Sequence, residues 1–391
     1  MSRNNFTCGI DVGTHATRVV VVGHNKGTND PSVLAVGQSL TEGMRFGYVT
    51  NIDLVAKSIK KAVKQAEDIL GSKIRRAYVS IGGINLSSIV STGSVIISKA
   101  DQEITHLDVE KVIALSEENL EILNKKIIHA IPIGYKLDGK DIHGKPEGMH
   151  GIKLEVKMLF IICLKQNIDD LITAFAQAQI EVEDVMVGII ASSAILLSSK
   201  QKIAGCALID IGAETVTLAC FENGLMISLQ VIGIGSMDIT KDIALGFRIS
   251  LEEAESIKLG SVIGGDYPKK KVDEIIEARL SDIFELVGNH LKRLHRNELL
   301  PAGMIITGGG SHINRIEDLA RSQLRLPAKI GPSDMMINNK LKIKDASWYT
   351  AFGLAMLEGD EMQNNNMSSD VRDNVNQIKR FFKSIFSQLL P

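Results

Sequence analysis

The sequence lacks the features that mark an exported or membrane-spanning protein. Its four cysteines lie far apart and form no CxxC pair, which indicates buried thiols in a reducing compartment. The first residues lack the basic and apolar regions of a secretory signal, so we expect the protein to remain in the cytoplasm. The longest apolar runs, 158–164 and 188–197, are much shorter than the about 20 residues that cross a bilayer, and we expect neither to span a membrane.

Several common binding motifs are absent as well. The formal net charge of −2 predicts no general attraction to nucleic acid. No segment matches the Walker pattern GxxxxGKS or GxxxxGKT, and the glycine pair Gly233 and Gly235 lacks the third glycine of a dinucleotide fingerprint. These two nucleotide-binding folds are therefore disfavoured.

What the sequence does contain is a strand, an acidic turn and a second strand, once in each half of the chain. Residues 9–14 lead into the apolar run 18–22, and residues 208–215 lead into the run 216–221. Two β-branched runs joined by a short glycine-containing turn predict a hairpin. A copy in each half indicates two lobes built on one plan.

The residues of these turns suit a phosphate chain. Glycine lets backbone N–H groups approach an anion without obstruction by a side chain, which is the role we expect for Gly13 and Gly212. Thr14 and Thr215 would add hydroxyl donors. The two turns are therefore candidate phosphate-binding turns.

Asp11 and Asp210 need a different role, because phosphates repel a neighbouring carboxylate unless a cation lies between them. Two aspartates that face each other across a cleft indicate Mg²⁺, an ion that binds few carboxylates and keeps several of its waters. We interpret both as residues that position a metal ion.

A third glycine-containing element lies near the end of the chain. The short apolar strand 302–306 precedes Gly308, Gly309 and Gly310, and a helix is expected at 313–324. A glycine loop between a strand and a helix presents free N–H groups to an anion or lets an adenosine moiety pack on the backbone.

A capped helix is predicted to begin at Ser250, with Glu253 three residues later. Glu255 and Lys258 fall on one face of this helix. From the residues alone, a surface ion pair worth a few tenths of a kcal/mol is the favoured interpretation.

Residues 84–164 differ in character from the rest and look like an inserted small α/β domain. Strands are expected at 94–98, 126–136 and 152–164, around a helix at 109–123. The segment also holds four histidines whose spacing matches no common metal-ligand pattern: His106, His129, His143 and His150.

The C-terminus joins a polar tether to a basic amphipathic helix. Residues 361–370 carry too little apolar surface to fold alone, whereas residues 371–391 have a net charge of +3 and one apolar face. Such a helix lies in the membrane interface and meets anionic lipids, although docking on the protein itself or on a partner is the alternative. The expected membrane-binding residues are Ile378, Lys379, Arg380, Phe381, Phe382, Ile385, Phe386 and Leu389.

The two acidic turns, the glycine loop, the helix at 254–258 and a closing helix at 351–355 resemble the actin-like ATPase superfamily in their order and spacing. Within it, the inserted segment, the residues 191–193 and the amphipathic C-terminus resemble the FtsA family of bacterial cell-division proteins. The resemblance covers almost the whole chain.

The resemblance implies an α/β, actin-like two-lobed ATPase fold with an inserted small α/β domain and a C-terminal amphipathic helix. The implied parts are lobe I in two pieces (1–83 and 165–200), the insert (84–164), lobe II (201–344), the closing helix of lobe I (345–360), the linker (361–370) and the membrane-targeting helix (371–391).

The resemblance also implies a function. The protein is expected to bind ATP and Mg²⁺, to tether FtsZ filaments to the cytoplasmic membrane and to help assemble the divisome at the septum. Implied partners are the C-terminal peptide of FtsZ, further copies in actin-like filaments, later division proteins and anionic lipids, with no nucleic acid. The implied location is peripheral, on the cytoplasmic face of the cytoplasmic membrane at the division site.

Site residues follow by resemblance. The residues of the first phosphate turn would be Asp11, Gly13 and Thr14, and those of the second would be Asp210, Gly212 and Thr215. The adenosine moiety would contact Glu255, Lys258 and the loop of Gly308, Gly309 and Gly310. The FtsZ-binding surface of the family lies on the second lobe, where Arg279 is the candidate contact.

The chain departs from the superfamily at two places. Ala213 and Glu214 separate Gly212 from Thr215, and a glutamate beside a γ-phosphate is electrostatically unfavourable. Hydrolytic relatives also carry an acidic residue just before the helix at 191–197, where none is present here. Orienting the attacking water contributes about 10²- to 10⁴-fold in rate, so we expect ATP binding with slow or negligible hydrolysis.

Other members of the superfamily remain as alternatives at this point. A pilus-assembly or rod-shape actin homologue would share the ATP site but lack this insert or carry its anchor elsewhere. A small-molecule kinase would need a catalytic carboxylate in the cleft and would have no use for a membrane helix.

Overall fold

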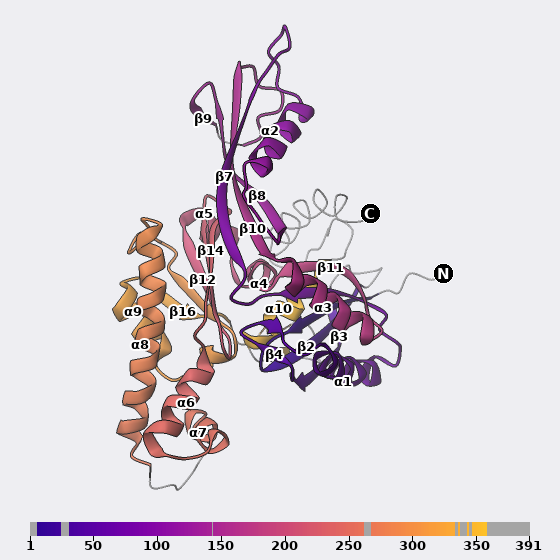
Figure 1. The fold of residues 1–391 in the computed structure, drawn as a ribbon. Coiled ribbons are helices and arrows are strands. Elements are labelled where there is room, and N and C mark those ends of the chain that lie inside the picture. The colour runs from indigo at the N-terminus through magenta and orange to yellow at the C-terminus, as the bar shows by residue number, and fades with distance from the viewer. Residues whose placement is uncertain are drawn as a thin grey trace.

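The computed structural model describes residues 6–24, 31–142, 144–261, 267–332, 335–336, 342–343 and 346–357. The predicted linker and membrane-binding helix, together with His143, lie outside the described residues. The described part forms two lobes side by side, with the insert standing away from them (Figure 1). Among the described helices, none combines the length and the apolar character that crossing a membrane requires.

Lobe I is built on a five-stranded sheet with the order β11-β6-β1-β2-β3. Its strands are β1 (Phe6–Val12), β2 (Ala16–His24), β3 (Pro31–Leu40), β6 (Arg76–Ile81) and β11 (Glu181–Val187). A small hairpin and four helices complete it: β4 (Met44–Arg45), β5 (Tyr48–Val49), α1 (Ile52–Leu70), α3 (Lys165–Gln177), α4 (Gly188–Leu196) and α10 (Tyr349–Ala355).

Helix α1 shows how local sequence sets an element. The side chain of Asn51 accepts a hydrogen bond from the backbone N–H of Leu54 and caps the N-terminus, and Gly71 ends the helix in the left-handed conformation. Its buried residues recur every three or four positions and pack on the sheet: Val55, Ala56, Ile59, Ala62, Val63 and Ala66.

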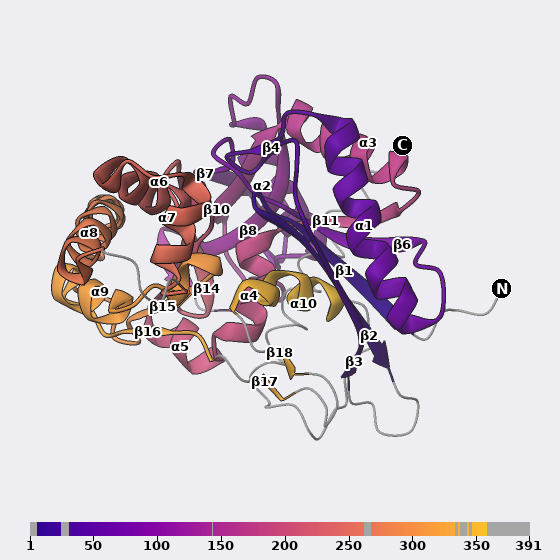
Figure 2. The same ribbon diagram turned by 90° about the horizontal axis from the view of Figure 1, so that it is seen from below.

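Lobe II contributes strands β12 (Cys206–Ile211), β13 (Val216–Glu222), β14 (Leu225–Ile232), β15 (Met304–Thr307) and β16 (Ala328–Ile330). Its helices are α5 (Ser199–Ala204), α6 (Ser236–Phe247), α7 (Leu251–Lys258), α8 (Lys269–Arg293), the 3₁₀ turn η1 (Gly309–His312) and α9 (Ile316–Leu324). The short elements β17 (Met335–Met336), β18 (Lys342–Ile343) and η2 (Ala346–Trp348) lead back to α10. In Figure 2, α4 and α10 lie between the lobes.

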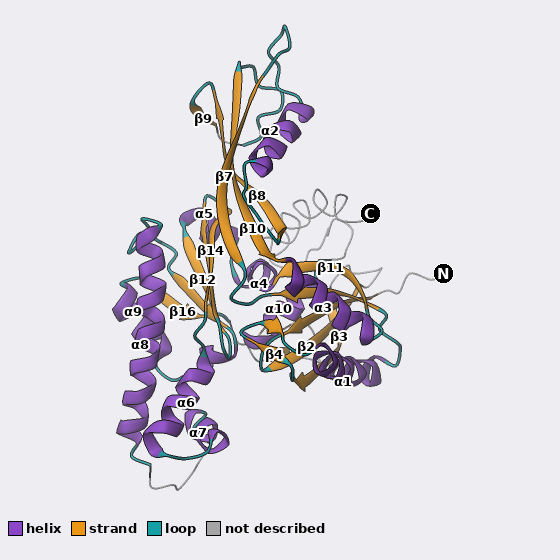
Figure 3. Ribbon diagram, in the orientation of Figure 1, coloured by secondary structure: helices purple, strands orange, loops and turns teal. Residues whose placement is uncertain are grey.

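The insert consists of β7 (Ser87–Ile96), α2 (His106–Glu118), β8 (Lys125–Leu137), β9 (Lys140–Ile142) and β10 (Lys153–Leu164). The helix begins three residues before its predicted start, because Thr105 and the carboxylate of Asp108 form a capping box. Helix α2 covers one face of the antiparallel strands and encloses a hydrophobic cluster of its own (Figure 3).

The insert is attached to both lobes. Strand β7 pairs with β14 at Ser87 and Gln230, so its sheet continues that of lobe II in the order β16-β15-β12-β13-β14-β7-β10-β8-β9. On the other side, Nε2 of the buried His129 accepts a hydrogen bond from the backbone N–H of Val187 at 3.2 Å, at the end of β11 in lobe I.

Candidate functional site

A cleft of about 640 Å³ lies between the lobes and is lined by both. Every residue that the sequence pointed to as a nucleotide contact lines it: Asp11, Gly13, Thr14, Asp210, Gly212, Thr215, Glu255, Lys258, Gly308, Gly309 and Gly310. These residues come from two strand ends with their turns, the glycine loop and the C-terminal half of α7, so the fold gathers residues that are far apart in the chain.

The first acidic turn joins β1 to β2. The strands pair with Asp11 opposite Arg18, and the N–H of Gly13 donates to the carbonyl of Ala16 at 3.1 Å, which closes the turn. From the neighbouring strand β6, the hydroxyl of Ser80 donates to Oδ1 of Asp11 at 2.6 Å. The carboxylate is thus held in place before any ligand binds.

The second acidic turn joins β12 to β13 by the same bond, from the N–H of Gly212 to the carbonyl of Thr215 at 2.9 Å. When the two turns are aligned on this bond, Gly212 corresponds to Gly13 and Ala213 corresponds to Thr14. The hydroxyls of Thr14 and Thr215 therefore occupy different positions in their turns, although both line the cleft.

Burial makes ionisation of both aspartates costly, and the charge of Asp11 adds to the cost at Asp210. The pKa of Asp210 is raised to about 7, mainly by burial and also by the nearby charge of Asp11, while Arg18 acts to lower it. Burial also raises the pKa of Asp11, against the hydrogen bond from Ser80 and the charge of Arg18. A cation between the two carboxylates would relieve this cost.

The oxygen donors in the cleft suit Mg²⁺ better than a metal ion that needs all of its ligands from protein side chains. Among the described residues, no group of three or more His, Cys, Asp or Glu side chains gathers to hold a metal. Asp11 and Asp210 alone suit an ion that keeps most of its waters and takes further oxygens from phosphates.

Arg18 and Ser80 line the cleft and were missed by the sequence reasoning. Nε of Arg18 is buried and has no hydrogen-bond partner among the described residues, while its guanidinium lies 5.7 Å from the ring centre of Trp348. A buried unpaired donor beside a cleft fits an anionic ligand. Arg18 could have been found from the sequence, because the predicted hairpin pairs it with Asp11.

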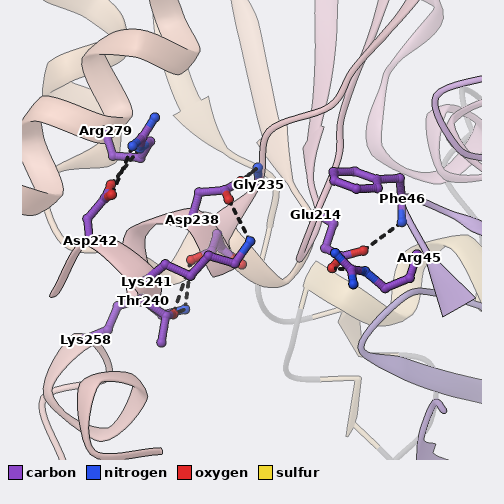
Figure 4. A network of polar contacts seen from close by, with 11 residues as sticks. Arg45, Phe46, Glu214, Gly235, Asp238, Thr240, Lys241, Asp242, Lys258 and Arg279 are labelled. Carbon is purple, nitrogen blue, oxygen red and sulfur yellow. Dashed lines mark hydrogen bonds and ion pairs between the residues drawn. The ribbon is translucent and has the colours of Figure 1, made fainter. Parts of the chain in front are cut away.

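Glu255 and Lys258 form an ion pair at 2.7 Å in the cleft wall, with the Lys258 side chain only 5% exposed. The surface-pair interpretation is therefore wrong. Lys258 donates to the Thr240 hydroxyl at 2.9 Å (Figure 4) and to the carbonyl of Ser236. Thr240 in turn donates to Glu255 at 2.5 Å. Burial acts to raise the pKa of Glu255, but the hydrogen bonds from Lys258 and Thr240 outweigh it and lower the pKa.

Glu214 does not line the cleft. Its carboxylate accepts a hydrogen bond from the backbone N–H of Phe46 at 2.7 Å and pairs with Nε of Arg45 at 2.9 Å, both in lobe I (Figure 4). The expected repulsion between this glutamate and a γ-phosphate has to be reconsidered, because Arg45 neutralises its charge.

The lining residues that precede α4 carry no carboxylate. At this place the cleft is lined by Val187, Gly188 and Ile189, and its only acidic lining residues in the described chain are Asp11, Asp210 and Glu255. The expectation of slow hydrolysis stays a prediction.

Arg279 lies outside the cleft on α8 (Figure 4). Its guanidinium makes a bidentate pair with Asp242 of α6, at 2.6 and 3.0 Å, and also bonds to Asp282. These bonds raise the pKa of Arg279, and its side chain remains 30% exposed.

The family model "Cell division protein FtsA" matches residues 207–353, and "SHS2 domain inserted in FTSA" matches residues 83–162. The FtsA protein of Bacillus subtilis is 31% identical over 376 residues, covering 90% of this chain and 83% of that protein. The chain belongs to the FtsA family.

Other relatives and structures agree with this membership. The FtsA protein of Pseudomonas aeruginosa is 28% identical over 384 residues, covering 93% of this chain and 91% of that protein. Among solved structures, the PilM-PilN type IV pilus biogenesis complex matches with a TM-score of 0.66 and 18% identity, over 91% of this chain and 98% of the matched chain. MreB5 of Spiroplasma citri bound to ADP matches with a TM-score of 0.50 and 14% identity, over 91% and 96%.

These matches confirm the predicted family and the actin-like α/β fold with its inserted domain. They establish an FtsA-family cell-division protein in preference to a pilus-assembly protein, a rod-shape protein or a small-molecule kinase.

Proposed function

We propose that the protein binds Mg·ATP in the cleft and acts in cell division as an actin-like adaptor that tethers FtsZ filaments to the cytoplasmic membrane. The observation that carries the nucleotide assignment is the convergence of two acidic turns, a glycine loop and the Glu255–Lys258 pair on one cleft of about 640 Å³. A cavity of this size and polarity suits a small-molecule ligand.

In this proposal each part of the cleft has one task. The backbone N–H groups of the two turns and the cation Arg18 meet the phosphates. Asp11 and Asp210 hold Mg²⁺, which would neutralise phosphate charge when bound. Glu255, Lys258 and the loop at 308–310 meet the adenosine. MreB5 of Spiroplasma citri, which shares the fold, was solved with ADP and with AMPPNP.

A direct test is the melting temperature of the full chain with and without Mg·ATP. We expect Mg·ATP to raise it, because a ligand that binds only the folded state stabilises that state. Asp210→Ala should abolish the rise. No shift in the parent protein would count against the nucleotide site.

Hydrolysis is proposed to be slow or negligible, in keeping with the absence of a carboxylate among Val187, Gly188 and Ile189. Single-turnover and steady-state phosphate release would test this. Turnover faster than about 1 s⁻¹, the low end of typical enzymes, would contradict it.

The FtsZ contact is proposed to include Arg279 on lobe II. Because Arg279 is partly exposed and already oriented by Asp242, it is positioned to receive an acidic group from a peptide. Arg279→Glu should weaken binding of the FtsZ C-terminal peptide in fluorescence anisotropy. Lys292→Glu, a charge reversal elsewhere on the same helix, serves as the control. Equal affinity of both variants and the parent would exclude Arg279.

The membrane attachment is proposed to reside in residues 371–391, with the linker 361–370 before it. Liposome flotation of the full chain beside a chain that ends at Asp370 tests it. We expect only the full chain to float with vesicles that contain anionic lipid, because the basic residues and the apolar face bind together. Assembly into filaments would add avidity by presenting many such helices at once.

A further inference from the structure

Glu214 is a departure from the superfamily pattern, and its surroundings differ from what its sequence position suggests. The residue is 8% exposed and lies at the tip of the second acidic turn. Its two carboxylate oxygens bond to Arg45 and to the backbone of Phe46 in the other lobe. This turn is therefore joined to lobe I beside the cleft.

The backbone that Glu214 contacts is the bend between β4 and β5. A second contact also holds this bend, because the N–H of Ile84 donates to the carbonyl of Phe46 at 3.1 Å. A side chain at Gly47 would lie 2.5 Å from Cα of Gly83, so the bend packs directly on the residues that follow β6. The position of the bend is thus fixed by Glu214 on one side and by lobe I on the other.

The next residue of the bend reaches the first acidic turn. The N–H of Gly47 donates to Oγ1 of Thr14 at 3.1 Å. Because this bond uses an acceptor site of the hydroxyl, the Thr14 proton remains available, and it has no acceptor among the described residues. Thr14 lines the cleft, so an anionic ligand there would provide that acceptor.

We propose that Glu214 is a positioning residue of the nucleotide site. By holding the backbone of Phe46, it keeps the Gly47 N–H within hydrogen-bond distance of Oγ1 of Thr14. The Thr14 hydroxyl then stays oriented as a donor to phosphate. The inference rests on the proposed nucleotide site and adds a residue outside the cleft to it. In this arrangement the two acidic turns are connected through three consecutive residues of lobe I, Arg45, Phe46 and Gly47.

The opposite role, repulsion of phosphate by the Glu214 charge, makes the reverse prediction for several variants. Glu214→Gln keeps the length of the side chain and an oxygen acceptor for Phe46 but removes the charge. Glu214→Asp keeps the charge but shortens the side chain, which breaks the bond to Phe46. Glu214→Ala removes both.

The test is the affinity of the full chain for Mg·ATP, measured by isothermal titration calorimetry. Positioning predicts about tenfold weaker binding for Glu214→Ala and Glu214→Asp, the size expected for one hydrogen bond to a charged group, and at most about threefold for Glu214→Gln. Repulsion predicts tighter binding for Glu214→Ala and Glu214→Gln and no change for Glu214→Asp. Affinities equal to or tighter than the parent's in Glu214→Ala would overturn the proposal.

Glu67 provides a matched control. Its side chain is 11% exposed, as is that of Glu214, and it also combines one exposed basic partner, Lys73, with one backbone donor, Ile74, but far from the cleft. Glu67→Ala should lower the melting temperature of the ligand-free protein about as much as Glu214→Ala while leaving the affinity for Mg·ATP unchanged. A loss of affinity in Glu67→Ala that matches Glu214→Ala would assign both to general destabilisation and overturn the proposal.

A second measurement tests whether Glu214 acts through Thr14. In a Thr14→Val background, Glu214→Ala should weaken Mg·ATP binding by less than about twofold, because the hydroxyl that it positions is gone. Independent, multiplying losses would overturn the proposed route. If the parent binds no Mg·ATP, the nucleotide site and this inference both fall; if it binds but Glu214→Ala is unaffected, only the inference falls.

Discussion

The first acidic turn presents the Asp11 carboxylate already bonded to the Ser80 hydroxyl, whereas the carboxylate of Asp210 in the second turn accepts no hydrogen bond from a described residue. The backbones of the two turns are nevertheless closed by the same N–H to carbonyl bond. The same hairpin therefore holds two carboxylates in different states. The Asp11 carboxylate is oriented by a hydrogen bond before a ligand binds, whereas the ionisation of Asp210 depends on what enters the cleft.

The comparison extends to the third residue of each turn, which lies near the opposite lobe in the first turn and bonds to it in the second. His15 of lobe I is close enough to Glu255 of lobe II to help lower its pKa, and Glu214 of lobe II bonds to lobe I at Arg45. The superfamily pattern describes the glycines and acids of these turns. Of the residues between them, Glu214 joins the two lobes directly.

The largest expected effect concerns the support behind the second turn. Gly308 has a φ of +87°, and a Cβ there would lie 2.1 Å from Oδ1 of Asp210, so Gly308→Ala should lower the free energy of unfolding by roughly 2–4 kcal/mol. Gly309→Ala, whose Cβ would meet nothing within 4 Å, should change it by less than about 0.5 kcal/mol. Chemical denaturation measures both. Equal effects would show that the second turn does not depend on close contact with Gly308.

A smaller effect separates the two aspartates by pH. Because the pKa of Asp210 is raised from 3.8 to about 7 in the folded state, its ionisation opposes folding as the pH rises between these values. Without Mg²⁺ or nucleotide, Asp210→Asn should therefore stabilise the protein by roughly 1–3 kcal/mol at pH 8, less than the full shift because the side chain partly meets solvent. The gain should vanish near pH 4.

Asp11→Asn is the matched comparison for the pH series. Its gain at pH 8 should be smaller, because the Ser80 hydroxyl stabilises the ionised carboxylate. A larger gain in Asp11→Asn than in Asp210→Asn would reverse the assignment of which carboxylate is oriented before a ligand binds.

The smallest expected effect tests whether the hydrogen bond from Ser80 orients Asp11 for binding. Ser80→Ala removes the hydrogen bond to Asp11 and should weaken Mg·ATP binding about tenfold, as expected for one hydrogen bond to a charged group. Ser39→Ala is the control, because its hydroxyl donates to the carbonyl of Ser58 in the same lobe and does not line the cleft. Titration calorimetry at fixed Mg²⁺ gives both affinities, and a Ser80→Ala affinity equal to the parent's would contradict the role of Ser80.

Local patterns predicted the parts of the site that depend on neighbouring residues. The spacing of apolar residues placed α1 at Ile52–Leu70, and the glycine-containing turns after Asp11 and Asp210 became hairpins. Such features follow from 3.6- and 2-residue periods and from turn chemistry, which a single sequence carries.

Contacts between distant segments could not be predicted in the same way. Ser80 reaches Asp11 because β6 runs parallel to β1, and Glu214 reaches Phe46 because the lobes pack against each other. No local pattern encodes either register. The ion pair of Glu255 and Lys258 was predicted as a pair, but its burial depends on α6, which covers it through Ser236 and Thr240.

The double attachment of the insert has a mechanical consequence. Its long strands are fixed near their base, to Gln230 of one lobe through β7 and to Val187 of the other through His129. A stiff sheet held at one end by two supports turns whenever those supports move relative to each other. Its displacement grows with distance from the pivot, so a small rotation of the lobes around a ligand would be amplified into a larger sweep at β9.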